Sequence, residues 1–342
     1  MTEATRCWRT AAMAAVALLA APATAEPATS SLPVIDMHLH AGRLNLRTPV
    51  PVCPGNQPIT YPALDPKEFL PAAQLTQCAK PILSPTTTAE LKQETIAELR
   101  HFNVRRAVLA GRPALVRDWS QAAPGLFIPA AAPIQSSAPA ITALRKLHEA
   151  GQAAVFAEIG AQYAGMRADD PKLAAFWALA EELDVPVGIH LGEGAPGQGH
   201  GSVADAYRAS LSSPFQLEEV LRKHPRLRLY VMHAASPLTD EMIAMLFTHA
   251  RLYVDVAANV WNMPRAQFYD QLKRLVDAGF SKRILFGSDQ TIWPQGIGLA
   301  IQSIEEASFL TAEQKRDIFY NNAARFLRLT KQQIAEDHAL RR

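Results

Sequence analysis

A His-x-His pair near the N-terminus is the first feature of this chain that could do chemistry. It lies in the segment 34–40, where polar and apolar residues alternate as in a β-strand. The alternation places Asp36, His38 and His40 on one face, which we expect to point into the protein, and the apolar residues on the other, which we expect to pack on helices. Two imidazoles at this spacing can bind one metal ion, and neutral imidazole suits zinc, iron, nickel or manganese. The pair alone is a weak signal, because two buried histidines can also satisfy each other.

Four more polar residues each end an apolar segment later in the chain. They are Glu158, His190, His233 and Asp289. In a parallel α/β barrel the catalytic groups lie at the carboxyl ends of the strands, so these side chains would meet the histidine pair on one face. A divalent metal ion held there would lower the pKa of bound water from about 15.7 toward 7. Water activated in this way attacks carbonyl or phosphoryl centres, so the pattern predicts metal-dependent hydrolysis.

The intervening sequence predicts the barrel that would position these residues. Apolar runs bounded by turn residues alternate with segments of helical periodicity, as in repeated βα units. The predicted strands are residues 32–40, 106–111, 126–133, 153–160, 185–191, 227–234, 252–257 and 283–288. They are rich in Val, Ile, Leu and Ala, as expected for strands with both faces buried. The predicted fold class is therefore α/β, a TIM (β/α)8 barrel.

Amphipathic segments between these strands would form the outer ring of the barrel. Apolar residues recur at three- and four-residue spacings in 88–102, 140–150, 171–183, 214–223, 239–250 and 265–278. Residues 297–309 and 312–327 predict two further helices, of which the second is an extra C-terminal helix. The polar residues beyond 327 are expected to form a mobile tail.

Residues 43–87 interrupt this rhythm with a long, Pro-rich insertion after the first strand. In a barrel it would lie over the C-terminal face as a lid or wall of the site, and a surface excursion away from the chemistry is the alternative. Cys53 and Cys78 both fall within it. In an oxidising compartment they would form a disulfide, and two free thiols or one metal-binding thiol are the alternatives.

With these residues the chain resembles the amidohydrolase superfamily, and most closely its amidohydrolase-related branch (amidohydrolase 2) of small hydrolases, lactonases and decarboxylases. The resemblance begins at Asp-Met-His-Leu-His in 36–40 and continues through Leu-Phe-Gly-Ser-Asp-Gln at 285–290. It ends at Asn-Asn-Ala-Ala-Arg-Phe-Leu in 321–327 and so covers most of the chain.

The resemblance implies a metal site whose ligands are His38, His40, His190 and Asp289. His233 is then either a ligand of a second metal or the group that polarises the substrate. Many relatives have a carboxylated lysine on strand four, where this chain has Glu158 and where other members use a carboxylate to bridge two metals. Glu158 either bridges two metals or orients a ligating imidazole. Asp36 lies deeper on its strand, so we expect it to support the structure rather than bind metal.

The predicted reaction is hydrolysis of an ester, lactone or amide of a small molecule, with one or two divalent ions. Zinc is the first expectation, and manganese, iron or nickel are the alternatives. Asp289 would accept a proton from water and pass it to the leaving group, while His233 would stabilise the developing oxyanion. The alternative is a metal-dependent non-oxidative decarboxylase, a carbon–carbon lyase also found in this branch. A non-catalytic periplasmic binding protein is a third hypothesis, disfavoured because every expected polar position is occupied.

Several residues that follow predicted strands are candidate substrate contacts. Arg112 could bind a substrate carboxylate in a bidentate contact, and His200 lies in a glycine-rich loop, 192–201, that borders the predicted site. Tyr163 and Trp293 could line the pocket, although no role is assigned to Tyr163. Solvent exposure for Arg112 and His200, and packing of the rim for Trp293, are the alternatives.

The first 25 residues have the layout of a secretory signal peptide, with arginines before the apolar run 11–21 and small residues before a cleavage site after Ala25. The run is about half the roughly 20 residues that a membrane-spanning helix needs. We therefore expect a periplasmic or secreted protein with no membrane attachment after cleavage. Residues 26–342 would form a single domain.

The charge of the chain narrows the class of partner. The formal net charge is +2, and Lys and Arg form no basic cluster. Nucleic acid is therefore not expected as a partner, and a small-molecule substrate is. A homo-oligomer is expected only on the general frequency of such assemblies.

Overall fold

The computed structural model of the chain describes residues 32–68, 75–132, 137–198 and 206–339. The predicted signal peptide, 1–25, and His200 lie outside these ranges. Within them, no helix combines the length and the apolar character needed to cross a membrane.

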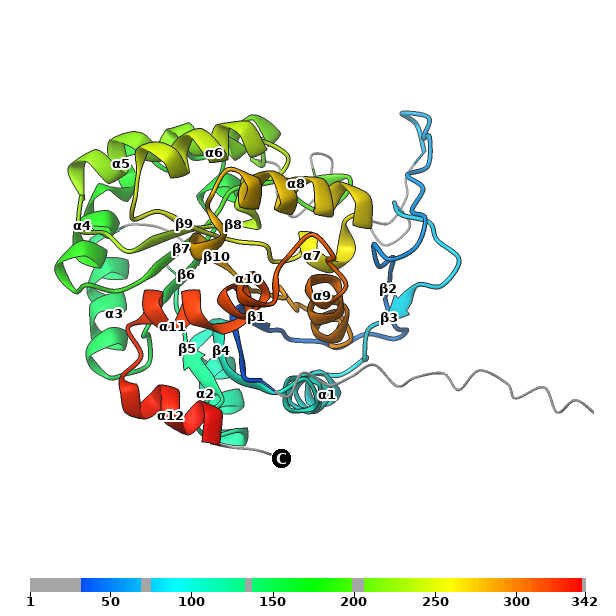
Figure 1. The fold of residues 1–342 in the computed structure, drawn as a ribbon, viewed down its shortest axis with the longest axis horizontal. Coiled ribbons are helices and arrows are strands. Elements are labelled where there is room, and N and C mark those ends of the chain that lie inside the picture. Colours follow the sequence, from blue (N-terminus) through cyan, green and yellow to red (C-terminus); the bar gives the residue numbers. More distant parts are fainter. Residues whose placement is uncertain (1–31, 69–74, 133–136, 199–205, 340–342) are drawn as a thin grey trace, which may run out of the picture.

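Eight of the described strands, all parallel, form a closed barrel (Figure 1). In sheet order they are β1 (Val34–Ala41), β4 (Val104–Gly111), β5 (Phe127–Pro129), then β6 (Phe156–Ile159), β7 (Val187–His190), β8 (Leu229–Met232), β9 (Tyr253–Asp255) and β10 (Ile284–Leu285). A bridge from Ala130 to Val155 joins β5 to β6, and one from Leu39 to Gln290 joins β1 to the residues after β10. The structure therefore confirms the predicted barrel.

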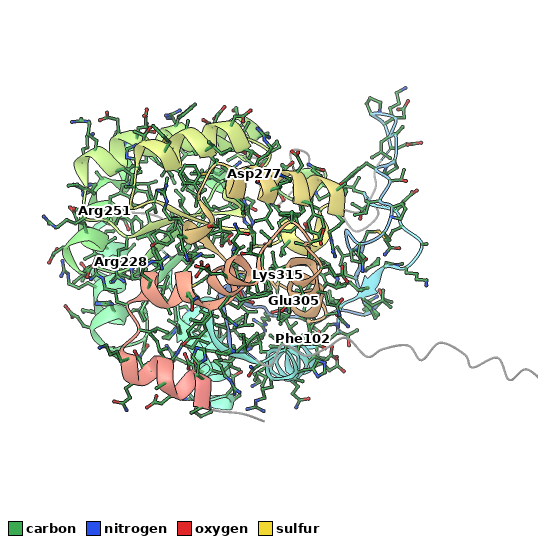
Figure 2. All side chains as sticks on the ribbon, in the orientation of Figure 1. Phe102, Arg228, Arg251, Asp277, Glu305 and Lys315 are labelled. Atoms are coloured by element: carbon green, nitrogen blue, oxygen red, sulfur yellow. A yellow bond between two sulfur atoms is a disulfide. The ribbon has the colours of Figure 1, made fainter. Side chains whose placement is uncertain are left out.

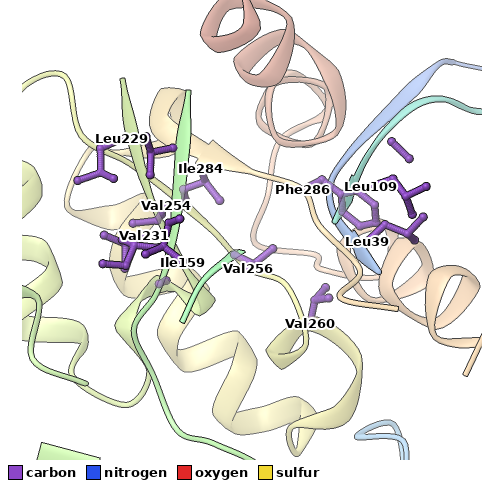
Figure 3. Packing of buried hydrophobic residues seen from close by; sticks show 14 of the residues in the cluster. Leu39, Leu109, Ile159, Leu229, Val231, Val254, Val256, Val260, Ile284 and Phe286 are labelled. Atoms are coloured by element: carbon purple, nitrogen blue, oxygen red, sulfur yellow. The ribbon is translucent and has the colours of Figure 1, made fainter. Parts of the chain in front are cut away.

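Helices follow the strands and cover the outside of the barrel. They are α1 (Thr88–His101), α2 (Pro113–Ala122), α3 (Ala138–Glu149), α4 (Ala174–Glu182), α5 (Glu218–Lys223), α6 (Thr239–Thr248), α8 (Arg265–Asp277) and α9 (Gly296–Glu305). Helix α1 begins at a capping box, in which the Thr87 side chain accepts the Glu90 N–H and the Glu90 side chain accepts the Thr87 N–H. Between the helices and the strands lies an apolar layer, of which Figure 3 shows Leu39, Leu109 and Phe286. Charged side chains such as Arg251 and Asp277 are exposed (Figure 2).

Shorter elements complete the described part of the chain. The helices are α7 (Asn259–Asn262), α10 (Ala312–Arg316), α11 (Asn322–Leu327) and α12 (Lys331–Ala339), and the strands are β2 (Pro51–Val52) and β3 (Ile82–Leu83). Short 3-10 helices span Ala161–Ala164, Pro171–Leu173, Ala209–Ser212, Pro214–Leu217, His233–Ala235 and Ser281–Arg283, and Asp317–Asn321 is π-helical.

Strand β1 does not keep the simple alternation that its sequence predicts. Ile35 and Met37 belong to the cluster inside the barrel, together with Tyr230, whose hydroxyl donates to the Met37 carbonyl at 3.1 Å. Leu39 instead packs in the outer layer. The pairing of β1 with β4 shifts register between Asp36 and Leu39, and such an irregularity re-aims the side chains beyond it. The prediction that the apolar residues of this strand share one outward face was therefore wrong for Ile35 and Met37.

The C-terminal residues close the end of the barrel where the strands begin. Phe326 of α11 packs into the interior cluster, and the Asn322 side chain donates to the Ile284 carbonyl at 2.8 Å. The polar tail that was expected to be mobile forms helix α12 instead. Asp337 on this helix is buried, and its Oδ2 accepts hydrogen bonds from Arg106 Nε at 2.7 Å and from the Tyr320 hydroxyl at 2.7 Å. The composition of this polar segment therefore does not show that it makes a buried ionic contact.

The insertion is tied to the C-terminal rim of the barrel. Strands β2 and β3 pair antiparallel, and a disulfide joins Cys53 to Cys78, whose Cα atoms are 5.8 Å apart. Gly55 exchanges backbone hydrogen bonds with α7 and α8, accepting the Arg265 N–H at 2.8 Å. Trp293 Nε1 donates to the Val50 carbonyl at 2.8 Å. The described part of the insertion accordingly lies beside α7 and α8 (Figure 1).

Replacing Asp337 by alanine tests the contact that docks α12. Asp337→Ala leaves Arg106, whose side chain is only 16% exposed, without its carboxylate. Loss of one partner of a buried ion pair is costly, so the free energy of unfolding should fall by about 3 kcal/mol in urea denaturation. Glu336→Ala is the matched control, because Glu336 is exposed and, among the described residues, its side chain bonds only Gln332. It should change stability by less than about 0.5 kcal/mol, and equal effects of the two substitutions would contradict the docking role.

Candidate metal centre

The barrel brings all six predicted metal-site residues together at its C-terminal mouth. These residues are His38, His40, Glu158, His190, His233 and Asp289. Each comes from the carboxyl end of a strand or from the residues that follow it. They divide into two groups of donor atoms that share Glu158.

The first donor group consists of His38, His40, Asp289 and one oxygen of Glu158. The Nε2 atoms of His38 and His40 are 3.2 Å apart and lie 3.4 and 3.0 Å from Asp289 Oδ1. Glu158 Oε2 is 3.6 Å from His38 Nε2 and 3.3 Å from His40 Nε2. For metal–ligand distances of about 2.1 Å, tetrahedral ligand atoms lie about 3.4 Å apart. The spacing and chemistry of these donors therefore fit a divalent metal ion.

The second donor group consists of His190, His233 and the other oxygen of Glu158. Glu158 Oε1 is 4.0 Å from His190 Nε2 and 3.6 Å from His233 Nε2. The two rings meet edge to face, with centroids 4.7 Å apart. These three donor atoms lie within 4.8 Å of one another. Three protein ligands leave a coordination position open, as in catalytic rather than structural zinc sites.

The backbone at two ligands has a conformation that few side chains adopt. His233 and Asp289 have φ of 60° and 51°, in the left-handed region. Such residues are held by surrounding structure at a cost of about 1–3 kcal/mol and concentrate at functional sites. Here the Asp289 N–H donates to the His38 carbonyl at 2.8 Å, which fixes Asp289 beside the first strand. A Cβ on Gly287 would come within 2.8 Å of His38 Cβ. The chain after β10 therefore needs glycine at this position to approach β1 so closely.

Three of the imidazoles are oriented by a hydrogen bond at Nδ1, the ring nitrogen that faces away from the cage. His38 Nδ1 lies 3.1 Å from Asp255 Oδ2, His190 Nδ1 lies 3.0 Å from Gln162 Oε1, and His233 Nδ1 lies 3.0 Å from the Ala257 carbonyl. Each partner is an acceptor, so each Nδ1 carries the hydrogen. The Nε2 lone pairs are then free to face the cage. This arrangement is the one that metal-binding histidines require.

The charges in the cage are strongly coupled. Burial alone would lower the pKa of His40, but its hydrogen bonds to Asp289 and Glu158 outweigh burial and raise the pKa to about 9. Burial alone would raise the pKa of Glu158 and of Asp289, but the surrounding histidines hold both values below their ordinary range. Burial, reinforced by charge on His233, lowers the pKa of His190 to about 4. Positive charge on histidines thus balances the carboxylates, and a divalent cation held in the cage would also supply positive charge.

Two supporting residues, Asp255 and Gln162, were not predicted from the sequence. Both are fully buried. Asp255 ends β9, so a polar residue at the end of an apolar strand was the signal that could have revealed it. Gln162 lies in a short 3-10 helix after β6 and had no such signal, since its role depends on the chain bringing it to His190.

Tyr163 is the residue next to the cage whose role was left open. Its hydroxyl lies 3.0 Å from His190 Nε2, the nitrogen that faces the second donor group. Burial, followed by the negative charge of Glu158, raises the pKa of Tyr163 well above its usual value. The phenol is therefore neutral and can donate a hydrogen bond at this point.

The remaining candidates have other positions. Asp36 is fully buried and accepts the backbone N–H of His38 and of Ser288, each at 3.0 Å, so its contacts are structural as expected. Arg112 is exposed at the start of α2. Trp293 binds the insertion through the Val50 carbonyl. No described contact joins Arg112 or Trp293 to the cage.

Comparison with known proteins agrees with the barrel fold. A family model described as Amidohydrolase matches residues 35–329, and no curated protein sequence matches the chain. A TIM-barrel protein from Bordetella bronchiseptica is 19% identical with a TM-score of 0.55, covering 70% of this chain and 82% of that one. The 2,6-dihydroxybenzoate decarboxylase from Rhizobium is 18% identical with a TM-score of 0.53, over 68% and 87%. A probable 2-pyrone-4,6-dicarboxylic acid hydrolase from Acinetobacter baumannii is 12% identical with a TM-score of 0.55, over 86% and 99%.

Metal addition should stabilise the protein through the cage. A ligand that binds only the folded state at one hundred times its dissociation constant stabilises by about 2.7 kcal/mol. Zinc added to chelator-treated protein should therefore raise the thermal midpoint. In His40→Asn, which removes a donor from the first group, the rise should be much smaller. His148→Asn is the matched control, because His148 contacts the Ala153 carbonyl outside the cage. A rise that is equal in wild type and His40→Asn would contradict the assigned site.

Proposed function

The chain belongs to the amidohydrolase family, and within this family we propose that it is a metal-dependent hydrolase of esters, lactones or amides of small molecules. The observation that supports this most directly is the position of Glu158. One carboxylate oxygen lies 3.3 Å from His40 in the first donor group, and the other lies 3.6 Å from His233 in the second. A carboxylate so placed can bridge two divalent ions, which we propose to be zinc. Bound there, the ions would supply a Lewis acid and an activated water.

The residues of the chain provide the proton transfer and charge stabilisation that hydrolysis needs. Asp289 Oδ1 faces His40 at 3.0 Å, which leaves its second oxygen to accept a proton from water and return it to the leaving group. His233 lies across the cage, with its ring held by the Ala257 carbonyl. Asp289 and His233, on opposite sides of Glu158, can thus assist the attacking water and stabilise the developing oxyanion, respectively.

Tyr163 adds a neutral hydrogen-bond donor beside the second donor group. In the absence of metal its hydroxyl donates to His190 Nε2. If His190 Nε2 held a metal ion instead, the Tyr163 hydroxyl would be available to donate to an oxyanion on the substrate. The phenol would act best as such a donor in the neutral form that its raised pKa ensures.

We also propose that the enzyme acts after export, in the periplasm or outside the cell. The N-terminal 25 residues have the signal-peptide pattern described above. The Cys53–Cys78 disulfide would persist in such an oxidising compartment. The partner that we propose for this site is a small-molecule substrate.

Elemental analysis of the purified protein tests the bridging role of Glu158. We expect two metal ions per chain, and one or none in Glu158→Ala, with loss of turnover on a panel of esters, lactones and amides. Glu181→Ala is the matched control, because it removes a carboxylate that pairs with His224 away from the cage. A single ion unaffected by Glu158→Ala, together with carbon dioxide release from aromatic carboxylates, would replace hydrolysis by the decarboxylase alternative.

Substitution of Tyr163 by phenylalanine tests its role in the reaction. Loss of one oxyanion donor lowers kcat by about 100- to 1,000-fold, so Tyr163→Phe should reduce kcat on this scale with little change in KM or metal content. Tyr269→Phe removes a hydroxyl that bonds the Ser303 carbonyl on the outside of the barrel and should leave kcat unchanged. An unchanged kcat in Tyr163→Phe would exclude this role.

A further inference from the structure

Asp255 is a fully buried carboxylate at the end of β9, and the described hydrogen bonds of its side chain go to His38, His233 and Ala257. Oδ2 lies 3.1 Å from His38 Nδ1. Oδ1 accepts the backbone N–H of His233 at 2.8 Å and that of Ala257 at 3.1 Å. Through these bonds one carboxylate holds the ring of a ligand in the first donor group and the turn that carries a ligand of the second.

The two carboxylate oxygens of Asp255 bind different partners, and this difference determines the tautomer of His38. A carboxylate oxygen accepts through two lone pairs, and those of Oδ1 are occupied by two backbone N–H groups. Oδ2 remains for His38, and an ionised carboxylate can only accept. Nδ1 of His38 must therefore carry the hydrogen, which keeps Nε2 available as a metal ligand.

His38 has no substitute for this partner. Its side chain is 0% exposed, so water cannot replace the carboxylate at Nδ1. His190 and His233 are held by neutral acceptors, the Gln162 amide and the Ala257 carbonyl. Of these three ligands, His38 alone is backed by a negative charge, which strengthens an imidazole as a ligand.

We propose that Asp255 is a positioning residue that fixes the Nδ1–H tautomer of His38 and thereby sets the metal affinity of the first donor group. This inference rests on the proposed metal-dependent function. It does not depend on which reaction the metal supports, so the two can fail separately.

Asp255→Asn inverts the polarity of the contact while preserving its shape. The amide oxygen must stay on the two backbone N–H groups, because rotation would place an NH2 group against two donors. The NH2 group then faces His38 Nδ1 and donates to it. His38 is driven to the Nε2–H tautomer, whose hydrogen occupies the position where metal would bind. Loss of such supporting contacts weakens metal binding by about 10- to 100-fold, and we expect the upper end of this range.

Asp36→Asn is the matched control. Asp36 is also fully buried, and its Oδ1 also accepts two backbone N–H groups, those of His38 and Ser288. Its described contacts include no ligand ring. A purely structural role for Asp255 predicts that the two substitutions have similar effects. A tautomer role predicts that only Asp255→Asn weakens metal binding.

The experiment measures zinc dissociation constants by chelator competition in the full chain, together with histidine 15N spectra of the zinc-loaded protein. We expect about 100-fold weaker binding of one zinc ion in Asp255→Asn and wild-type binding in Asp36→Asn. The spectrum of wild type should show a strongly deshielded Nδ1 proton on His38, which Asp36→Asn keeps and Asp255→Asn loses.

Two results would overturn the inference while leaving the proposed hydrolase intact. The first is equal zinc affinity in the two variants. The second is a wild-type spectrum with no proton on His38 Nδ1, which requires no variant and so does not depend on whether Asp255→Asn folds. Tight zinc binding in wild type without any hydrolysis would instead overturn the proposed function and leave the role of Asp255 standing. A wild type that binds no zinc would overturn both.

Discussion

Acceptors behind three imidazoles of this cage bind Nδ1 and thereby direct Nε2 toward the position where metal would bind. The acceptors come from three places in the chain: Asp255 on β9, the Ala257 carbonyl just beyond it, and Gln162 in the turn after β6. None of these is adjacent in sequence to the histidine it orients. The barrel fold brings these acceptors and histidines together, since its parallel strands end at one face and the turns that follow them meet there. A strand displaced by one residue would exchange inward and outward side chains and break these contacts.

The sequence predicted the parts of this arrangement that depend on one strand at a time. Each predicted strand overlaps an observed one, because runs of branched apolar residues between turn signals are characteristic of strands buried on both faces. The six residues of the cage were predicted for the same reason, since a charged or imidazole side chain at the end of such a strand is conspicuous. The division of Asp289 and His190 between the two donor groups could not be predicted, because it depends on the geometry of several strands together.

The predictions that were wrong or incomplete failed for the same physical reason. Ile35 and Met37 lie in the interior cluster whereas Leu39 packs in the outer layer, and the register shift between Asp36 and Leu39 that separates them has no signature in the alternation itself. Helix α12 was expected to be mobile because its sequence is polar, yet Asp337 is buried by pairing with Arg106, a residue more than two hundred positions away. Asp255 was missed although it ends an apolar strand, because its partners His38 and His233 lie on other strands. In each case the decisive contact joins residues far apart in the chain.

The fold does not distinguish hydrolysis from decarboxylation, since one fold supports many chemistries, and the proposed hydrolysis rests instead on the balance of charge in the cage. Glu158, Asp289 and Asp255 all touch the ligand set, and the lowered pKa values of Glu158 and Asp289 keep both ionised. If every histidine were neutral, as a metal ligand must be, one divalent ion beside these three carboxylates would leave the cage with a net negative charge. Such a cage repels the substrate carboxylate that a decarboxylase must bind. Two divalent ions would reverse the sign and would favour hydroxide and a developing oxyanion, as the proposed hydrolysis requires. The third carboxylate, buried behind His38, is therefore easiest to understand in a site that holds two ions.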